Sequence, residues 1–176
     1  MNKKAQVWIE TVLYTLIGLA LMGLALGFVM PKINEARDRA LVEQAISSLS
    51  SLDSKITETI QTGTGNVRQT EFLMKRGEIY INASYDEIYM ILGDLAKPYS
   101  EPGVNIPIGR VNVMSIMGQK ISSVKLSLTY NANVTYSGLD NDRKFTAAPT
   151  PYRFYIENKG VLNNKILLNI EEISNR

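Results

Sequence analysis

The sequence contains no cysteine and no histidine among its 176 residues. Without cysteine there are no disulfide bonds and no thiol nucleophiles, and without histidine there are no imidazole bases and none of the commonest zinc ligands. A Ser-His-Asp triad is therefore impossible, and no glycine-rich phosphate loop is present. We predict that the chain has no catalytic site, no metal site and no cofactor.

A strong charge of either sign is also missing. Lys and Arg total 19 and Asp and Glu total 17, which gives a formal net charge of +2. There is no basic stripe interleaved with aromatic residues, so nucleic acid is not an expected partner. The length suits one domain with its own core and one additional element.

What the sequence does have is a long uncharged run near its start. No charged residue occurs from Thr11 to Pro31, and Leu, Ile, Val, Met, Gly and Ala dominate this stretch. Roughly 21 residues of helix would be about 30 Å long, which matches the hydrocarbon core of a bilayer. The run predicts a membrane span over about 11–31. Lys3 and Lys4 before it favour a cytoplasmic N-terminus and an external C-terminus.

The apolar run passes directly into an amphipathic pattern. Apolar residues then recur mostly every three or four positions, as in a helix with one buried face: Ile33, Ala40, Leu41, Ala45, Leu49, Leu52, Ile56 and Ile60. The first strong helix breaker is the segment Gly63-Thr64-Gly65-Asn66. These features predict one helix over 6–62, about 80 Å long, with a kink or local loosening at Pro31.

Beyond Gly65 the helical spacing gives way to alternation of apolar and polar residues. Clear examples are 78–82, 111–116, 125–130, 152–157 and 165–171, separated by turns rich in Gly, Pro, Asn and Asp. The pattern predicts a β-rich head domain over 66–176, built as an antiparallel sheet or sandwich. Asp140-Asn141-Asp142 fits a polar turn better than a calcium loop, because the distal glutamate of such a loop is missing.

The most informative motif is Lys3-Lys4-Ala5-Gln6-Val7-Trp8-Ile9-Glu10, which directly precedes the apolar run. An ordinary secretory signal is cut after its apolar stretch, whereas here the plausible junction lies before it. The motif resembles the class III, prepilin-type signals of archaeal type IV pilins and archaellins. That resemblance implies that residues 1–5 are a signal peptide, which a membrane aspartyl peptidase removes by cutting between Ala5 and Gln6. The hydrophobic helix would then stay on the mature chain.

The resemblance also implies a role for Glu10, which becomes the fifth residue after cleavage. In type IV pilins a Glu at this position pairs with the freed N-terminal amine of a neighbouring subunit. The amine and the positive end of the helix dipole both favour a carboxylate there. The alternative interpretation is a Glu at the headgroup level of a simple signal anchor. Gly23 and Gly27 form a G-x-x-x-G pair that would let helices approach closely, although glycines are common in membrane helices.

The resemblance implies an α+β lollipop fold, in which a long N-terminal helix, transmembrane in its N-terminal half, packs on an antiparallel β head. It implies a structural subunit of an archaeal type IV pilus-like surface filament, held in the cell membrane by its single span before assembly, with the head outside. The implied partners are a prepilin peptidase, membrane lipid, other copies of the chain, and an assembly ATPase with its platform protein.

Two alternatives remain open at this point. The chain could be a monomeric membrane-anchored β-domain that binds a surface ligand outside the cell. It could also be a minor pilin or pseudopilin of a secretion or uptake system. Two further motifs, Asn82-Ala83-Ser84 and Asn133-Val134-Thr135, match the N-glycosylation acceptor pattern and predict possible glycans on the external domain.

Overall fold

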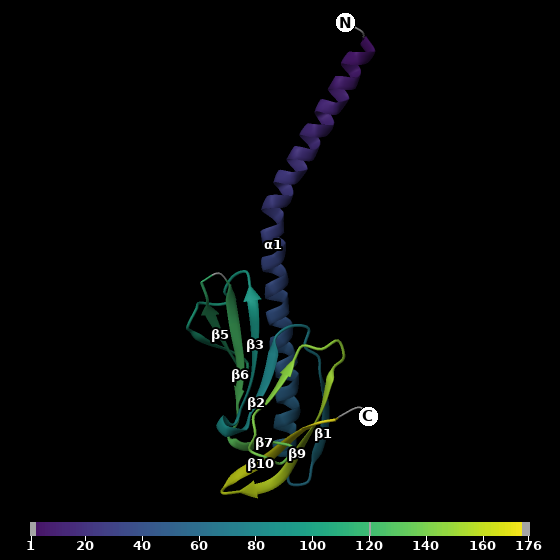
Figure 1. The fold of residues 1–176 in the computed structure, drawn as a ribbon. Helices are drawn as coiled ribbons and strands as arrows, with labels where there is room; N and C mark the ends of the chain where they lie inside the picture. The colour runs from purple at the N-terminus through teal and green to yellow at the C-terminus, as the bar shows by residue number, and fades with distance from the viewer. Residues whose placement is uncertain (1–2, 120, 174–176) are drawn as a thin grey trace. The chain divides into compact units, whose positions relative to one another are not determined.

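A computed structural model describes residues 3–119 and 121–173 of the chain. Within this part the chain forms one long helix, followed by ten strands and a short 3-10 helix (Figure 1). The chain divides into two compact units, Met1–Arg37 and Asp38–Arg176. We call the second unit the head.

The helix α1 spans Lys3–Gln61, and its helical conformation continues through Pro31. A proline removes one backbone donor and crowds the preceding turn, which can bend a helix without ending it. The predicted kink at Pro31 stays a prediction. The helix ends where the sequence predicts, because Gly63 and Gly65 adopt positive φ angles of 89° and 81°, a conformation that side chains with a Cβ rarely tolerate.

One sheet of the head has four strands in the order β1-β9-β10-β7. Their bounds are β1 Val67–Phe72, β7 Ala132–Tyr136, β9 Tyr152–Leu162 and β10 Lys165–Glu172. The pairs β1–β9 and β9–β10 are antiparallel, whereas β7 and β10 are parallel. The parallel pair is possible because β8 and β9 form a long connection between its two strands.

The second sheet has six strands in the order β4-β5-β6-β3-β2-β8, and all of its pairs are antiparallel. Their bounds are β2 Glu78–Asn82, β3 Glu87–Leu95, β4 Asn105–Ile108, β5 Val111–Met117, β6 Ser122–Thr129 and β8 Arg143–Thr146. The 3-10 helix η1 (Ala83–Tyr85) connects β2 to β3.

The C-terminal half of α1 and both sheets share one hydrophobic core. Helix residues Val42, Leu49 and Ile56 are fully buried, as are Ile156 of the first sheet and Leu126 of the second. Along β3, β5 and β6 buried residues alternate with partly exposed ones, because successive side chains point to opposite faces of a sheet. The amphipathic half of the helix is therefore part of the head.

The structure confirms the predicted α+β fold, a long N-terminal helix followed by largely antiparallel sheets. Strand β2 coincides with the predicted 78–82, and the other four predicted strands lie within β5, β6, β9 and β10 or overlap them closely. The parallel pairing of β7 with β10 is the difference from a purely antiparallel head.

Candidate functional site

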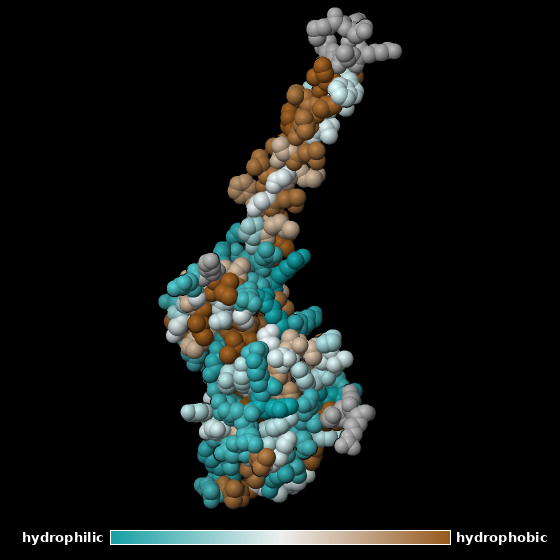
Figure 2. Space-filling view, viewed as in Figure 1, coloured by the Kyte–Doolittle hydropathy of each residue, from teal (hydrophilic) through white to brown (hydrophobic). Residues whose placement is uncertain are grey.

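The N-terminal half of α1 exposes its apolar side chains. Large residues from Val7 to Met30 are exposed along the whole segment, and Trp8 and Phe28 reach 70% and 80%. Figure 2 shows this part of the helix as a hydrophobic surface. By length and composition, α1 is apolar enough to span a membrane. Exposure of so much apolar surface on one helix indicates a lipid or protein environment rather than water.

Two threonine hydroxyls inside this segment bond to the helix backbone itself. The Thr11 hydroxyl donates to the Val7 carbonyl oxygen at 2.9 Å, and the Thr15 hydroxyl donates to the Thr11 carbonyl oxygen at 2.8 Å. Such bonds to the preceding turn remove the cost of placing a hydroxyl in an apolar environment.

The glycines of the segment have open space beside them. A Cβ placed on Gly18, Gly23 or Gly27 would meet no atom within 4 Å. Each glycine lowers helix stability by about 1 kcal/mol relative to alanine, and no contact within the chain at these positions requires the missing Cβ. The predicted role of Gly23 and Gly27 in helix packing is untested by the structure but is compatible with it.

The predicted processing junction lies at the very start of α1. The backbone of Lys3, Lys4, Ala5 and Gln6 forms the first turn of the helix, while their side chains lie outside the described residues. Glu10 follows one turn later and its side chain is exposed. The structure brings these residues together on one helix end. It does not test their roles.

The two predicted glycosylation motifs lie in different sheets. Asn82 ends β2, and its side-chain oxygen accepts a hydrogen bond from the Tyr85 backbone amide at 3.2 Å, which caps η1. Asn133 lies on the edge strand β7. The threonine of its motif, Thr135, is buried, and its hydroxyl donates to Asn169 Oδ1 at 3.2 Å. In the folded head the Asn82 motif is therefore the more accessible of the two.

Asp38 ties the first turn of the head's helix to strand β3. Its carboxylate accepts hydrogen bonds from Arg76 Nη1 at 3.0 Å and from the Ala96 backbone amide at 2.7 Å. Arg76 also donates to the carbonyl oxygens of Gly93, at 2.7 Å, and Asp94. A charged pair with further backbone bonds fixes position more firmly than an exposed ion pair.

Asp53, about four turns further along α1, makes a second polar link between the helix and the rest of the head. The buried Asp53 carboxylate accepts from the Tyr130 hydroxyl at 3.1 Å and pairs with Arg110 Nε at 3.2 Å. The Arg110 guanidinium also lies 5.7 Å from the centre of the Tyr130 ring. Burial raises the pKa of Tyr130 far above its usual value, and the neighbouring Asp53 carboxylate raises that pKa further.

Asn158 forms the third link, at the C-terminal end of α1. This buried residue of β9 donates from Nδ2 to the carbonyl oxygens of Thr59 and Ile60, both at 3.4 Å, and accepts from the Gly160 amide at 2.9 Å. The last carbonyls of a helix have no intrahelical partner. Asn158 therefore completes the helix end while joining it to the first sheet.

The outer face of the six-stranded sheet carries a cluster of aromatic and charged side chains. Tyr80 and Tyr89 stack with ring centres 4.8 Å apart. Glu78 pairs with Lys144 at 2.6 Å and accepts from the Tyr80 hydroxyl at 2.5 Å. The lysine lowers the pKa of Glu78, and the carboxylate in turn raises the pKa of Lys144. The charges are thus mutually neutralised across the strands.

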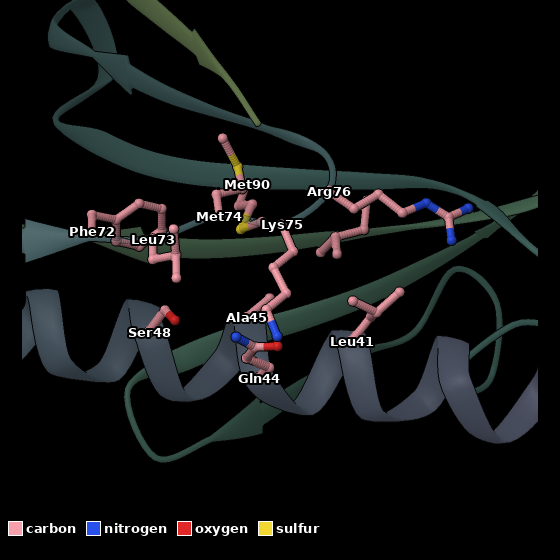
Figure 3. A pocket seen from close by; sticks show the side chains of 11 residues that line it. Leu41, Gln44, Ala45, Ser48, Phe72, Leu73, Met74, Lys75, Arg76 and Met90 are labelled. Atoms are coloured by element: carbon pink, nitrogen blue, oxygen red, sulfur yellow. The ribbon is translucent and has the colours of Figure 1, made fainter. Parts of the chain in front are cut away.

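A narrow crevice lies between α1 and the segment that follows β1 (Figure 3). Leu41, Ala45, Phe72, Met74 and Met90 are among the residues that line it. Its free volume of about 10 Å³ is close to the minimum for a single water molecule. It is too small for an organic ligand.

No group of three or more Asp or Glu side chains within residues 3–119 and 121–173 is arranged to hold a metal ion. Asp140, Asn141 and Asp142 lie in the exposed loop between β7 and β8, as expected for a polar connection. The adjacent carboxylates Asp86 and Glu87 have separate partners: Asp86 pairs with Lys165 at 3.1 Å and Glu87 pairs with Lys125 at 2.9 Å.

Sequence reasoning missed the polar links at Asp38, Asp53 and Asn158. Their partners lie many residues away in the sequence, so no local motif predicts these links. The one available signal was that Asp38 and Asp53 lie on a helix face that otherwise carries apolar or small residues. A carboxylate buried on such a face needs a hydrogen-bond or charged partner.

Compared with protein-family models, with curated proteins and with solved structures, the chain matches none.

Proposed function

We propose that this chain is a structural subunit of an archaeal type IV pilus-like surface filament. It is anchored in the membrane through the N-terminal half of α1 before assembly, and it polymerises through that same helix. The observation that carries the proposal is the apolar, exposed segment from Val7 to Met30, which is continuous with the helix half that forms part of the head's core.

Such a segment has two suitable environments. In the membrane its side chains contact lipid, and its threonine hydroxyls bond to the helix backbone. In a filament the same side chains contact the helices of other subunits. Lipid is as apolar as leucine, so transfer between these environments depends on close packing more than on hydrophobic burial. The open faces at Gly18, Gly23 and Gly27 suit such packing.

The three polar links within the head support this role. Within the part of α1 that belongs to the head, Asp38, Asp53 and Asn158 fasten the helix to both sheets near its start, in its middle and at its end. When a subunit is extracted from the membrane through its helix, that helix must stay packed in the core of the head. Subunits joined by head-to-tail contacts that do not close then grow a helical fibre.

Processing of the N-terminus tests the proposal. The chain is co-expressed with a prepilin peptidase whose activity is verified on a known substrate, and its intact mass and N-terminal sequence are measured. We expect loss of residues 1–5, with Gln6 as the new first residue. Because the junction needs a small residue, Ala5→Leu should block cleavage, whereas the matched control Ala5→Gly should permit it.

Retention of Met1 or Asn2 in the presence of active peptidase would contradict the proposal. The segment would then be a plain signal anchor. The head would instead be screened as a membrane-anchored binding domain.

A further inference from the structure

The end of β5 and the turn that follows it carry three exposed apolar side chains: Ile116 (46%), Met117 (67%) and Ile121 (53%). We call these three residues the apolar tip. Met117 pairs with Ser122 across the hairpin, and the Gly118 amide donates to the Ile121 carbonyl oxygen at 3.0 Å. A Cβ on Gly118 would collide with that oxygen, so this glycine allows Met117 and Ile121 to lie close together. Figure 2 shows hydrophobic atoms on the part of the head where Figure 1 labels β5.

The apolar tip lies at the end of the head where the chain enters from α1. Asp38, the first residue of the head, accepts a hydrogen bond from the Ala96 amide at 2.7 Å. The preceding residue, Leu95, pairs with Ser122, which in turn pairs with Met117. Neighbouring strands are about 4.8 Å apart, which places the tip within roughly 15 Å of Asp38. All of these contacts are internal to the head.

Covalent connection brings this end of the head close to the bilayer. Asp38 follows Pro31, the end of the uncharged run, by only a few residues. In helical conformation this spacing is about 10 Å, whereas the headgroup layer on each side of the hydrocarbon core is roughly 5–8 Å thick. With the apolar run in the membrane, the covalent connection therefore keeps Asp38 near the headgroups, and the tip lies within roughly 15 Å of Asp38.

We propose that the apolar tip inserts into the headgroup–acyl boundary of the bilayer that holds α1. The inference rests on the membrane-anchored stage of the proposed function. It gives the unassembled subunit a second membrane contact, made by Ile116, Met117 and Ile121. This contact restricts how the head is oriented above the membrane until the subunit is extracted.

Two features favour lipid over a second copy of the chain as the occupant. A stable protein interface uses about 20–30 residues on each side, and three side chains on a narrow hairpin turn fall far short of that. Before assembly, the linkage through α1 also tethers the tip to the bilayer, so even a weak contact is favoured by effective concentration.

The absence of native cysteine makes the test direct. Single spin labels are placed on the full, uncleaved chain at Met117→Cys, Val161→Cys and Leu21→Cys, and each variant is studied in lipid nanodiscs. Val161 is the matched control: it is 70% exposed, close to the 67% of Met117. Val161 follows Gly160 in β9, and the Gly160 amide bonds to Asn158. Asn158 in turn contacts the C-terminal end of α1, whereas Asp38 lies at the opposite end of the helix segment in the head. Leu21 reports on the span.

We expect labels at 21 and 117 to be accessible to oxygen and protected from an aqueous nickel reagent, and the label at 161 to be open to nickel. Adding Ile121→Glu to the chain labelled at 117 should cause loss of this protection, with thermal unfolding as the check that the head stays folded. A label at 117 as open to nickel as that at 161, with 21 protected, overturns the inference but leaves the anchor intact.

Two other outcomes also decide the matter. If position 21 is open to nickel, both the anchored stage and the tip contact are wrong. If 117 is protected only when several copies share a nanodisc, the occupant is another subunit and the lipid contact is wrong.

Discussion

At the scale of single residues, the head depends on carboxylates that each satisfy more than one partner. Asp38 binds a guanidinium and a backbone amide, and its side chain is only 16% exposed. Asp53 binds a tyrosine hydroxyl and a guanidinium in a buried position. A partner left without its carboxylate would be desolvated and unpaired, which costs more than the intact bond contributes.

Asp38→Ala should therefore destabilise the head by about 2–3 kcal/mol, because Arg76 and the Ala96 amide both lose their acceptor. The measurement is urea unfolding of the full chain in detergent, followed by tyrosine fluorescence. Glu43→Ala is the matched control on the same helix: it removes the exposed pair with Arg39 at 3.2 Å and should cost less than about 0.5 kcal/mol. Equal effects of the two changes would show that Asp38 is no more than a surface charge.

Tyr130 predicts a pH dependence of stability. Its pKa in the folded head is raised, mainly by burial, while in the unfolded chain it is about 10. Above about pH 10 the unfolded chain releases this proton and the folded head keeps it, so stability falls as pH rises. Tyr130→Phe, which removes the titrating hydroxyl, should cost about 1 kcal/mol at neutral pH and should flatten the decline. The free energy of unfolding of both proteins is measured from pH 9 to 11.5. An equal decrease in the unchanged chain and in Tyr130→Phe would contradict this prediction.

At the scale of elements, Asp86 joins the two sheets. It follows η1 with a left-handed backbone at φ 52°. Its Oδ1 accepts from the Val134 amide of the edge strand β7 at 2.9 Å, and its Oδ2 accepts from Lys165 of β10 at 3.1 Å. A side chain that satisfies an exposed strand edge takes the place of a neighbouring strand.

Asp86→Ala should cost about 2–3 kcal/mol, because it loses both bonds and places alanine in a left-handed conformation. Asp86→Asn is the matched control. It keeps the oxygen that faces Val134 and tolerates the backbone angle, so it should cost less than about 1 kcal/mol. Hydrogen exchange at the Val134 amide gives the local readout, with faster exchange in the alanine variant alone. Protection that is unchanged in both variants would mean that β7 does not depend on Asp86.

The elements also show what the sequence could predict. The spacing of Leu49, Leu52 and Ile56 predicted a buried helix face, and alternation predicted β2 to its residue limits. Strand β4 is short, contains Pro107 and is exposed throughout, so it gave no such signal. The division of strands between two sheets, and the parallel pairing of β7 with β10, arise from tertiary packing that local periodicity does not encode.

The candidate site divides in the same way. The junction at Ala5 and Gln6, Glu10, and the glycine pair are local motifs, which a sequence can reveal and which remain predictions. The contacts of Asp38 and Asn158 connect residues far apart in the chain. Only the folded head brings them together.

At the scale of the whole molecule, the two units suit different environments: the N-terminal unit suits an apolar one and the head suits water. Residues up to Arg37 expose an apolar helix, whereas the head buries its apolar residues around the continuation of that helix. A chain of this kind needs a membrane, an assembly, or both in succession. The proposed life cycle supplies both, with removal of residues 1–5 as the step between them.

The central claim, that processed subunits polymerise through α1, is tested most directly by electron cryomicroscopy. Filaments are sheared from cells that express the chain with its peptidase and assembly machinery. The account predicts a helical core built from the residues 7–30 of many subunits, with heads outside, and it predicts that Glu10→Ala abolishes filaments while Gln6 still becomes the first residue. Processed chain that stays in the membrane as monomers, or fibres whose subunits meet only through their heads, would contradict it.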